Sequence, residues 1–353
     1  MQNPSAETDI ERPAAEDRGE PAGGLGAIAQ LEPFALAATR AAALACQAWV
    51  GRGRKEDADE ACTEAMREVL ASAPGKGTVV IGEGAKDEAP MLFDGEELGD
   101  GDGPDFDIAV DPLEGTTLCA QGLPGSLATI AFAEASAMTR LGAAFYMDKL
   151  VGPPEVCDAI QLTDPPEQTL ENAAEALGKP VDELWVVVLD KPRHEDLIGQ
   201  IHSAGARVTS PPDGDVAGAL QALLPDGGAD LLMGIGGTPE GILTACAVRS
   251  LGGCMQARLA PQDEEEEEAV EQAELSTERI YELDELVQGD AFFVATGVTG
   301  GSLLRAPWRL EGETHTESIV VATGSVRQVV EAQPMAATTR KDDDPAGGQG
   351  GDA

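Results

Sequence analysis

The sequence predicts an α/β fold in which some strands pair in parallel. Short β-branched or apolar runs that end at glycine, such as "GTVVIG" at 77–82, have the length and composition of buried strands. Longer segments with helical apolar spacing lie between several of these runs. From residue 183 to 224 the order is strand, helix, strand, helix, and connections of that kind join parallel strands.

The first part of the chain is expected to begin with two helices and to continue with strands. An alanine- and leucine-rich helix is predicted from Glu32 to Val50, and the sequence "GRGRK" closes it. A second helix from about Asp57 to Ser72 ends before Pro74-Gly75. Three apolar runs that follow are predicted strands: 77–84, 106–112 and 126–135.

The second part of the chain repeats the order of strand and helix. Residues 229–251 read as a strand, a glycine turn and a helix. Residues 262–286 are predicted to form a charged helix or surface excursion whose acidic side chains face the solvent. Two apolar runs, 291–298 and 318–330, supply late strands.

Two α/β domains are expected, over residues 28–152 and 153–335. A Gly-Pro-Pro sequence at 152–154 marks the point where the chain changes character. The terminal segments 1–27 and 336–353 are polar and rich in proline, glycine or acidic residues, so both are predicted to be disordered. No internal repeat is found.

The composition excludes several classes of protein. Apolar residues make up 42% of the chain, which is enough for a core, although aromatic residues contribute only 3%. Because no run of about 18 apolar residues exists and the N-terminus lacks a signal-peptide pattern, we expect a cytoplasmic protein with no membrane partner.

The net charge of −41 is extreme and is spread along the whole chain. A nucleic-acid partner is not expected, because binding to phosphate backbones needs clustered lysine and arginine. Seven lysines against sixteen arginines, together with this acidity, indicate adaptation to a salty cytoplasm in which ions screen self-repulsion. The alternative is acidity without functional consequence.

Any metal ion is expected to be held by carboxylates. The three histidines are far apart in the sequence, and the six cysteines show no C-x-x-C spacing, so a zinc site is disfavoured and buried free thiols are expected. Oxygen ligands favour hard cations such as Mg²⁺ or Mn²⁺.

Carboxylates recur where apolar strands end. Glu83 follows "VVIG", Asp111 and Glu114 fall in a turn that begins with Pro112, and Glu240 follows "MGIGGTP". One such acid is more often a solvated loop residue, but four at the carboxyl ends of strands favour a shared cation site. Asp59 joins them if the end of its helix faces the same cleft.

The segment "LEGTT" adds groups suited to a phosphate. Gly115 lets backbone amides approach an anion, and a helix that begins there directs its positive end toward it. Thr116 is then placed to share a proton with a metal-bound water, although it also suits a helix N-cap.

Seven motifs in order carry a family resemblance. "DPLEGT" resembles the signature of the lithium-sensitive, metal-dependent sugar phosphatases. The ordered set resembles class II fructose-1,6-bisphosphatase of the GlpX type over about residues 30–330: "GRGRKEDAD", "VVIGEGAKDEAPML", "DIAVDPLEGTT", "YMDKLVGP", "KPRHEDLI", "PDGDVAGAL" and "MGIGGTPEGIL". The resemblance implies a layered α-β-α-β-α sandwich, with a metal-binding catalytic domain (28–152) and a sugar-phosphate-binding domain (153–335) on either side of the active-site cleft.

The resemblance also implies residue roles. The implied metal ligands are Asp59, Glu83, Asp111, Glu114 and Glu240, and the implied catalytic residues are Thr116, Asp87 and Lys55. The implied substrate contacts are Glu114, Gly115, Thr116, Tyr146, Lys191, Pro192, Arg193, Asp213, Gly214, Asp215 and Gly237.

These roles agree with the chemistry of the side chains. Lys191 and Arg193 suit the phosphate that is not cleaved, and the acids of "DGD" can accept hydrogen bonds from sugar hydroxyls. The alternative role of Lys191 and Arg193 is in surface ion pairs, and the alternative role of "DGD" is a simple turn. Ala85 departs from the family pattern, which often has an acid there, and the acidic insert at 263–268 lies outside that pattern.

The expected activity is Mg²⁺- or Mn²⁺-dependent hydrolysis of fructose 1,6-bisphosphate to fructose 6-phosphate and phosphate, by a homodimer or homotetramer. Additional activity on sedoheptulose 1,7-bisphosphate is an alternative. An inositol-monophosphatase-like enzyme is a second alternative, and "KPR" argues against it. A catalytically silent sugar-phosphate-binding regulator is a third, and the intact acid set argues against it.

Overall fold

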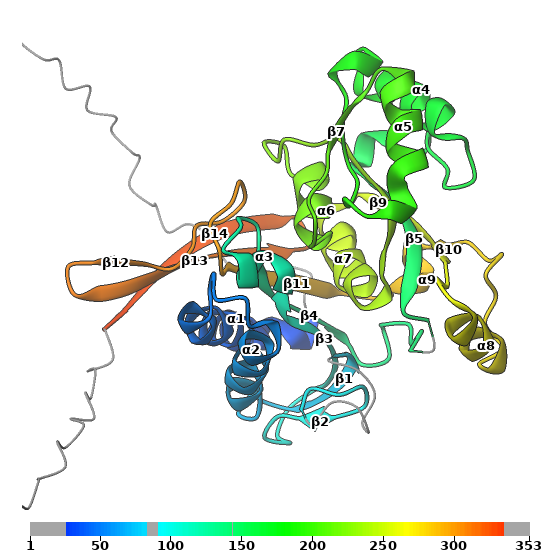
Figure 1. Ribbon diagram of the computed structural model, residues 1–353. Coiled ribbons are helices and arrows are strands. Elements are labelled where there is room, and N and C mark those ends of the chain that lie inside the picture. Colours follow the sequence, from blue (N-terminus) through cyan, green and yellow to red (C-terminus); the bar gives the residue numbers. More distant parts are fainter. Residues whose placement is uncertain (1–25, 83–90, 143, 335–353) are drawn as a thin grey trace, which may run out of the picture.

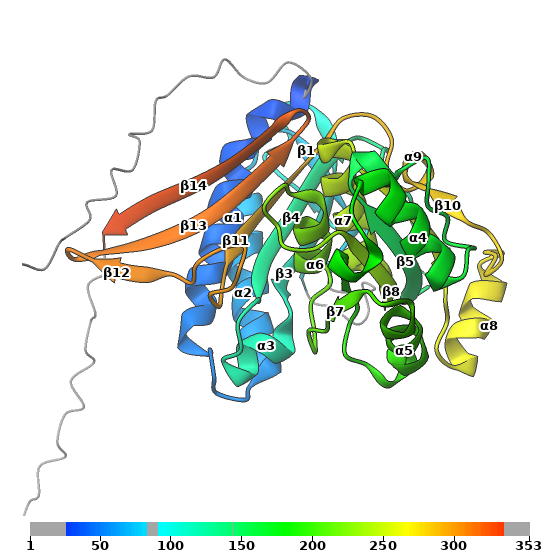
Figure 2. The same cartoon turned by 90° about the horizontal axis from the view of Figure 1, so that it is seen from above.

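A computed structural model describes residues 26–82, 91–142 and 144–334. Within these ranges the chain folds into two β-sheets and alternating layers of helices (Figures 1 and 2). No helix of the described ranges is both long and apolar enough to cross a membrane.

The first sheet is eight-stranded, with the order β12-β13-β11-β4-β3-β1-β2, and β14 pairs with β13. Its central strands β1 and β3 are parallel, whereas β3–β4, β4–β11, β11–β13 and β13–β14 are antiparallel. The bounds are β1 (Lys76–Ile81), β2 (Glu97–Leu98), β3 (Asp105–Glu114), β4 (Leu127–Glu134), β11 (Ala291–Gly297), β12 (Trp308–Leu310), β13 (Glu313–Ala322) and β14 (Ser325–Pro334).

The second sheet is six-stranded, with the order β10-β9-β5-β8-β6-β7. Strand β6 is parallel to β7 and β8, which confirms the parallel pairing predicted from the β-α-β rhythm. The bounds are β5 (Tyr146–Gly152), β6 (Trp185–Val187), β7 (Arg207–Thr209), β8 (Leu231–Gly237), β9 (Cys254–Leu259) and β10 (Tyr281–Glu282).

Helices cover both sheets and fill the space between them. The α-helices are α1 (Glu32–Ala45), α2 (Lys55–Leu70), α3 (Thr116–Gln121), α4 (Pro166–Leu177), α5 (Glu195–Ala204), α6 (Val216–Leu223), α7 (Thr238–Leu251), α8 (Glu264–Gln272) and α9 (Leu283–Leu286). Short 3-10 helices are η1 (Gly26–Leu31), η2 (Cys46–Ala48), η3 (Pro154–Val156), η4 (Val181–Glu183) and η5 (Pro192–His194). The helix predicted as far as Val50 therefore ends as an α-helix at Ala45.

Figure 2 shows the layers from above: α1 and α2, the first sheet, α6 and α7, the second sheet, then α4 and α5. This is the predicted α-β-α-β-α sandwich. Three apolar cores fill the interfaces between the layers, and one of them packs α6 and α7 against both sheets. Strand β4 serves two of them, because Ile130 and Phe132 pack on the side of α1 while Ala131 and Ala133 pack on the side of α7.

Strand pairing does not follow the predicted limit between the domains at residue 152. Strand β5 lies before that limit but belongs to the second sheet, and the late strands β11–β14 belong to the first. The antiparallel pairing of β11 with β4 joins residues more than 150 positions apart, such as Val294 and Ile130, and no local pattern predicts such pairing. The six cysteines are free thiols, and Cys46, Cys62, Cys119 and Cys246 are buried.

Candidate active site

A bulge in β3 brings Asp111 and Glu114 to one face of the first sheet. Asp111 pairs with Thr129 of β4 and Glu114 pairs with Leu127, so three steps on β3 lie opposite two steps on β4. In a regular strand without a bulge, side chains three positions apart point to opposite faces. The expected turn at Pro112 is therefore wrong, because the strand continues to Glu114. Proline has no N–H to donate, and it is tolerated at this position because a bulged residue makes no ladder hydrogen bond.

The third acid of the cluster comes from the helix that follows a strand of the second sheet. Glu240 lies in the first turn of α7, directly after β8. A Cβ atom on Gly237 would lie 1.7 Å from the Glu240 Oε2 atom, so glycine is required for this carboxylate position. Oxygen atoms of Asp111, Glu114 and Glu240 all lie within 4.8 Å of one another.

The carboxylates of this cluster are electrostatically strained. Burial raises the pKa of Glu114 well above its usual range, and the charges of Asp111, Glu240 and Asp215 raise it further. Burial also raises the pKa of Glu240, with Asp215 adding to the effect and Lys149 opposing it. Crowded buried acids of this kind need a proton or a cation to offset their charge.

The donor set fits a hard divalent cation. Among the described residues, the buried Glu240 Oε2 atom has no hydrogen-bond partner. Glu114 accepts one hydrogen bond at Oε1 from the Val216 N–H, at 3.0 Å, which orients its carboxylate. Clustered carboxylate oxygens are the ligands that Mg²⁺ and Mn²⁺ prefer. A cation in this cluster would therefore be held by oxygens that the fold has already placed.

A cavity of about 260 Å³ opens beside the three acids. Asp59 of α2 and Thr116 of α3 also line it. The backbone turns sharply before Thr116, because Gly115 adopts a left-handed conformation with φ of 75°. Gly115 occupies the N-cap position, so the alternative role of Thr116 as the N-cap is wrong.

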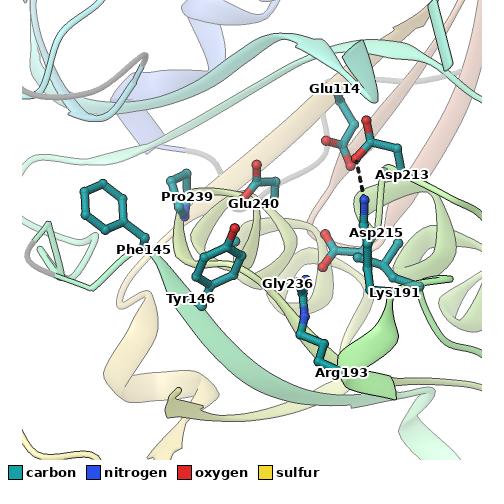
Figure 3. A pocket seen from close by; sticks show the side chains of 13 residues that line it. Glu114, Phe145, Tyr146, Lys191, Arg193, Asp213, Asp215, Gly236, Pro239 and Glu240 are labelled. Atoms are coloured by element: carbon teal, nitrogen blue, oxygen red, sulfur yellow. Dashed lines mark ion pairs between the residues drawn. The ribbon is translucent and has the colours of Figure 1, made fainter. Parts of the chain in front are cut away.

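A second cavity of about 400 Å³ adjoins the first (Figure 3). The two cavities share Glu114, Asp213, Pro239 and Glu240 as lining residues. The other lining residues of the larger cavity are Phe145, Tyr146, Leu189, Lys191, Arg193, Gly214, Asp215, Gly236 and Gly237. One cleft between the two sheets therefore has an acidic end and an end that carries two cations.

Each cation of the larger cavity is held by a neighbour. Lys191 Nζ lies 4.0 Å from Asp213 Oδ1, the ion pair drawn in Figure 3. Arg193 donates from Nε and Nη2 to the Ile235 carbonyl, and its guanidinium lies 5.0 Å from the centre of the Tyr146 ring. Asp213 also accepts a hydrogen bond from the Thr117 N–H, which ties the larger cavity to α3.

Sequence reasoning missed Lys149. This lysine is 1% exposed, and its Nζ lies 2.5 Å from Asp215 Oδ2 and 3.0 Å from the Gly237 carbonyl oxygen. A Cβ atom on Gly236 would lie 1.9 Å from the same Asp215 oxygen, so this strand end leaves room for the ion pair. The sequence did contain a signal for this ion pair, because Lys149 lies inside the apolar run of β5 and a buried lysine is rarely unpaired.

The remaining predicted residues lie elsewhere. Pro192 begins η5 and does not line either cavity. Lys55 lines neither cavity, but its Nζ donates to the Thr117 hydroxyl at 2.8 Å and so contacts the residue after Thr116. Glu83 and Asp87 lie outside the described residues, as does Ala85.

Comparison with known proteins identifies the family of the chain. The family model described as "Bacterial fructose-1,6-bisphosphatase, glpX-encoded" matches residues 30–333. A fructose-1,6-bisphosphatase class 2 of Haemophilus influenzae is 42% identical over 297 residues, which cover 80% of this chain and 89% of the relative.

A D-fructose 1,6-bisphosphatase class 2/sedoheptulose 1,7-bisphosphatase of Synechococcus sp. (strain JA-3-3Ab) is 41% identical over 328 residues, which cover 86% of this chain and 92% of the relative. The match of the family model spans both sheets and every element that lines the two cavities. The chain belongs to the family of bacterial, glpX-encoded fructose-1,6-bisphosphatases.

Proposed function

We propose that the protein hydrolyses the 1-phosphate of fructose 1,6-bisphosphate and releases fructose 6-phosphate and inorganic phosphate. The observation that carries the proposal is that one cleft has a cluster of carboxylates at one end and two cations at the other. Three carboxylates with oxygens within 4.8 Å of one another line the acidic end, and Lys191 and Arg193 line the other. Family membership and the activity for which the Haemophilus influenzae relative is named support the same substrate.

Asp111, Glu114 and Glu240 are the residues that would hold a divalent cation, and Asp59 lies on the same cavity wall. Glu83 completes the proposed ligand set. Bound Mg²⁺ or Mn²⁺ would polarise the phosphoryl group and make a water molecule acidic enough to serve as a nucleophile near neutral pH. The choice between the two ions is part of the proposal.

Thr116 is proposed to orient the attacking water. Its position at the start of α3, on the wall shared with Asp111 and Glu114, allows its hydroxyl to accept a proton from the water and pass one to a neighbouring carboxylate. Lys55 would steady this segment through the Thr117 hydroxyl. Asp87 is proposed to assist catalysis on the strength of the motif alone.

The sugar and its second phosphate would occupy the larger cavity. Lys191 and Arg193 would bind the phosphate that is not cleaved, with Pro192 shaping the turn between them. Asp213 and Asp215 would accept hydrogen bonds from sugar hydroxyls. Gly115, Gly214 and Gly237 leave room for the ligand to approach the backbone, and Tyr146 packs beside it.

A second candidate activity, on sedoheptulose 1,7-bisphosphate, is favoured by one observation. Relatives from Synechococcus that are 40–41% identical carry both activities in their names. An inositol-monophosphatase-like activity fits less well, because two cations line the far end of the cleft. We also propose that the protein acts as a homodimer or homotetramer in a salty cytoplasm.

The test is phosphate release from a panel of sugar bisphosphates and monophosphates, each with Mg²⁺, with Mn²⁺ and with EDTA. We expect release from fructose 1,6-bisphosphate with a divalent ion and none with EDTA. Binding of the bisphosphate without release under any metal condition would instead support a silent regulator. Equal rates on inositol monophosphate would remove the proposed specificity.

A further inference from the structure

Glu266 is a buried acid in an otherwise solvated helix. Five consecutive glutamates, 264–268, open α8, and four of them are exposed. Glu266 is only 4% exposed, and Val270, one turn later, packs into the core between the sheets. The expectation that this acidic segment faces the solvent throughout is therefore wrong at Glu266.

The Glu266 carboxylate accepts hydrogen bonds from three backbone N–H groups. Its Oε1 atom lies 2.7 Å from the Phe145 nitrogen and 2.8 Å from the Tyr146 nitrogen. Its Oε2 atom lies 2.9 Å from the Gln262 nitrogen. Hydrogen bonds to a charged acceptor are stronger than neutral ones, and they compensate the burial of the carboxylate.

These hydrogen bonds hold the backbone at the start of β5 in place. The Tyr146 carbonyl accepts a hydrogen bond from the Ala260 N–H at 3.0 Å, just before Pro261 takes the chain away from the sheet. The Phe145 carbonyl accepts one from the N–H of Thr238, the first residue of α7, at 2.9 Å. Glu266 supplies the acceptor for the two N–H groups of the same dipeptide.

Phe145 and Tyr146 form one wall of the larger cavity. Figure 3 shows their side chains with Pro239 and Glu240 nearby and Arg193 beyond the Tyr146 ring. The guanidinium of Arg193 lies 5.0 Å from the centre of that ring. A shift at the start of β5 would therefore displace the tyrosine and the arginine that packs against it.

We infer that Glu266 is a positioning residue that sets the affinity of the cleft for the sugar bisphosphate through the backbone of Phe145 and Tyr146. The inference rests on the proposed function for the identity of the ligand. It gives the acidic helix α8 a role in the site although α8 contributes no residue to either cavity lining.

The test compares Glu266→Ala with Glu266→Gln and with Glu265→Ala. The alanine variant removes the acceptor. The glutamine variant keeps a carbonyl oxygen that can accept from the N–H groups of Phe145 and Tyr146. Glu265→Ala removes the same charge from an exposed neighbour. In Mn²⁺ assays with fructose 1,6-bisphosphate, we expect Glu266→Ala to raise KM by at least about fivefold, and by more than it lowers kcat. Glu266→Gln should recover most of the affinity, and Glu265→Ala should match the wild type.

A folded Glu266→Ala protein with wild-type KM would overturn the inference. If circular dichroism shows that this variant does not fold, Glu266→Asp is used in its place, because it keeps the charge and withdraws the carboxylate by one methylene. A wild-type KM of Glu266→Asp would also overturn the inference. Calorimetric titration of the same proteins with the bisphosphate in EDTA measures affinity without turnover. It separates a loss of positioning from a failure of the proposed hydrolysis, which would appear as an inactive wild type.

Discussion

Thr116 and Glu114 line the same cavity wall, and each is given a different task in the proposed hydrolysis. We predict that Thr116→Ala and Glu114→Ala each lower kcat by at least ~10²-fold, the usual cost of losing a proton-transfer or charge-stabilising group. Steady-state assays with saturating Mn²⁺ measure the effect. Thr116→Ser is the matched control for the hydroxyl and should retain most of the activity. Full activity of either alanine variant would remove the proposed centre.

Glu114 also links metal binding to stability. Burial and the neighbouring acids hold its pKa in the folded protein well above the usual glutamate value of 4.5. The native protein thus binds more protons than the unfolded chain above pH 4.5, and the metal-free protein loses stability as the pH rises through that window. Glu114→Gln cannot ionise and escapes this loss.

We therefore predict that, in EDTA at pH 8, the Tm of Glu114→Gln exceeds that of the wild type by about 2 °C or more. The difference should shrink as the pH falls toward 5. Saturating Mn²⁺ should reverse the order, because ligand binding stabilises only the protein that retains the full site. Scanning calorimetry over this pH range measures all three effects, and a variant that is never more stable than the wild type in EDTA would contradict the argument.

Single residues differed in how far the sequence revealed them. The acids at strand ends were predictable because a run of apolar residues followed by a carboxylate is a local pattern. Lys149 and Glu266 were not, because their roles depend on partners far along the chain, namely Asp215 for the lysine and the Phe145 and Tyr146 amides for the glutamate.

At the scale of elements, the bulge in β3 decides whether Asp111 and Glu114 share a face. We predict that deletion of Pro112 removes the bulge but leaves Asp111 and Glu114 two positions apart, still on one face of a regular strand, so that the variant keeps its binding of Mn²⁺. Pro112→Ala is the matched control, since it changes the same residue and keeps the strand length. Calorimetry with Mn²⁺ and kcat are the measurements.

Circular dichroism must show that the deletion variant is folded. A folded deletion variant that no longer binds Mn²⁺ would contradict this prediction and show that a shared face alone does not align the two acids. The sequence held a signal for this bulge, because a proline within a strand occurs mainly at edges and bulges. The signal points to an irregularity but does not say which face the next side chain takes.

The order of strands in the sheets was the least predictable feature at this scale. Local periodicity identified the runs at 291–298 and 318–330 as strands, which are now β11 and parts of β13 and β14. That β11 pairs with β4 follows from the packing of both faces of β4 against α1 and α7, and such packing is a property of the assembled layers.

For the whole molecule, the net charge of −41 dominates the expected response to salt. The Debye length falls from about 10 Å at 0.1 M to about 3 Å at 1 M, so added salt screens repulsion between surface carboxylates. We predict that the Tm rises by at least about 5 °C between 0.1 and 2 M KCl, measured by scanning calorimetry. Sucrose at equal osmolality should raise it less. A Tm that is flat over this range would argue against salt adaptation.

The sequence by itself determined the α/β class, the five alternating layers through the family resemblance, and several of the acids and cations that line the cleft, among them Asp111, Glu240 and Lys191. These follow from local composition and from motifs whose residues stand close together in the chain. The tertiary structure alone decided that oxygens of Asp111, Glu114 and Glu240 lie within 4.8 Å of one another, that Lys149 pairs with Asp215 beside them, and that Glu266 accepts hydrogen bonds from the Phe145 and Tyr146 backbone. The physical reason is that charge and hydrogen-bond partners act over a few ångströms in space, and the chain brings those partners together only after both sheets have packed against α7.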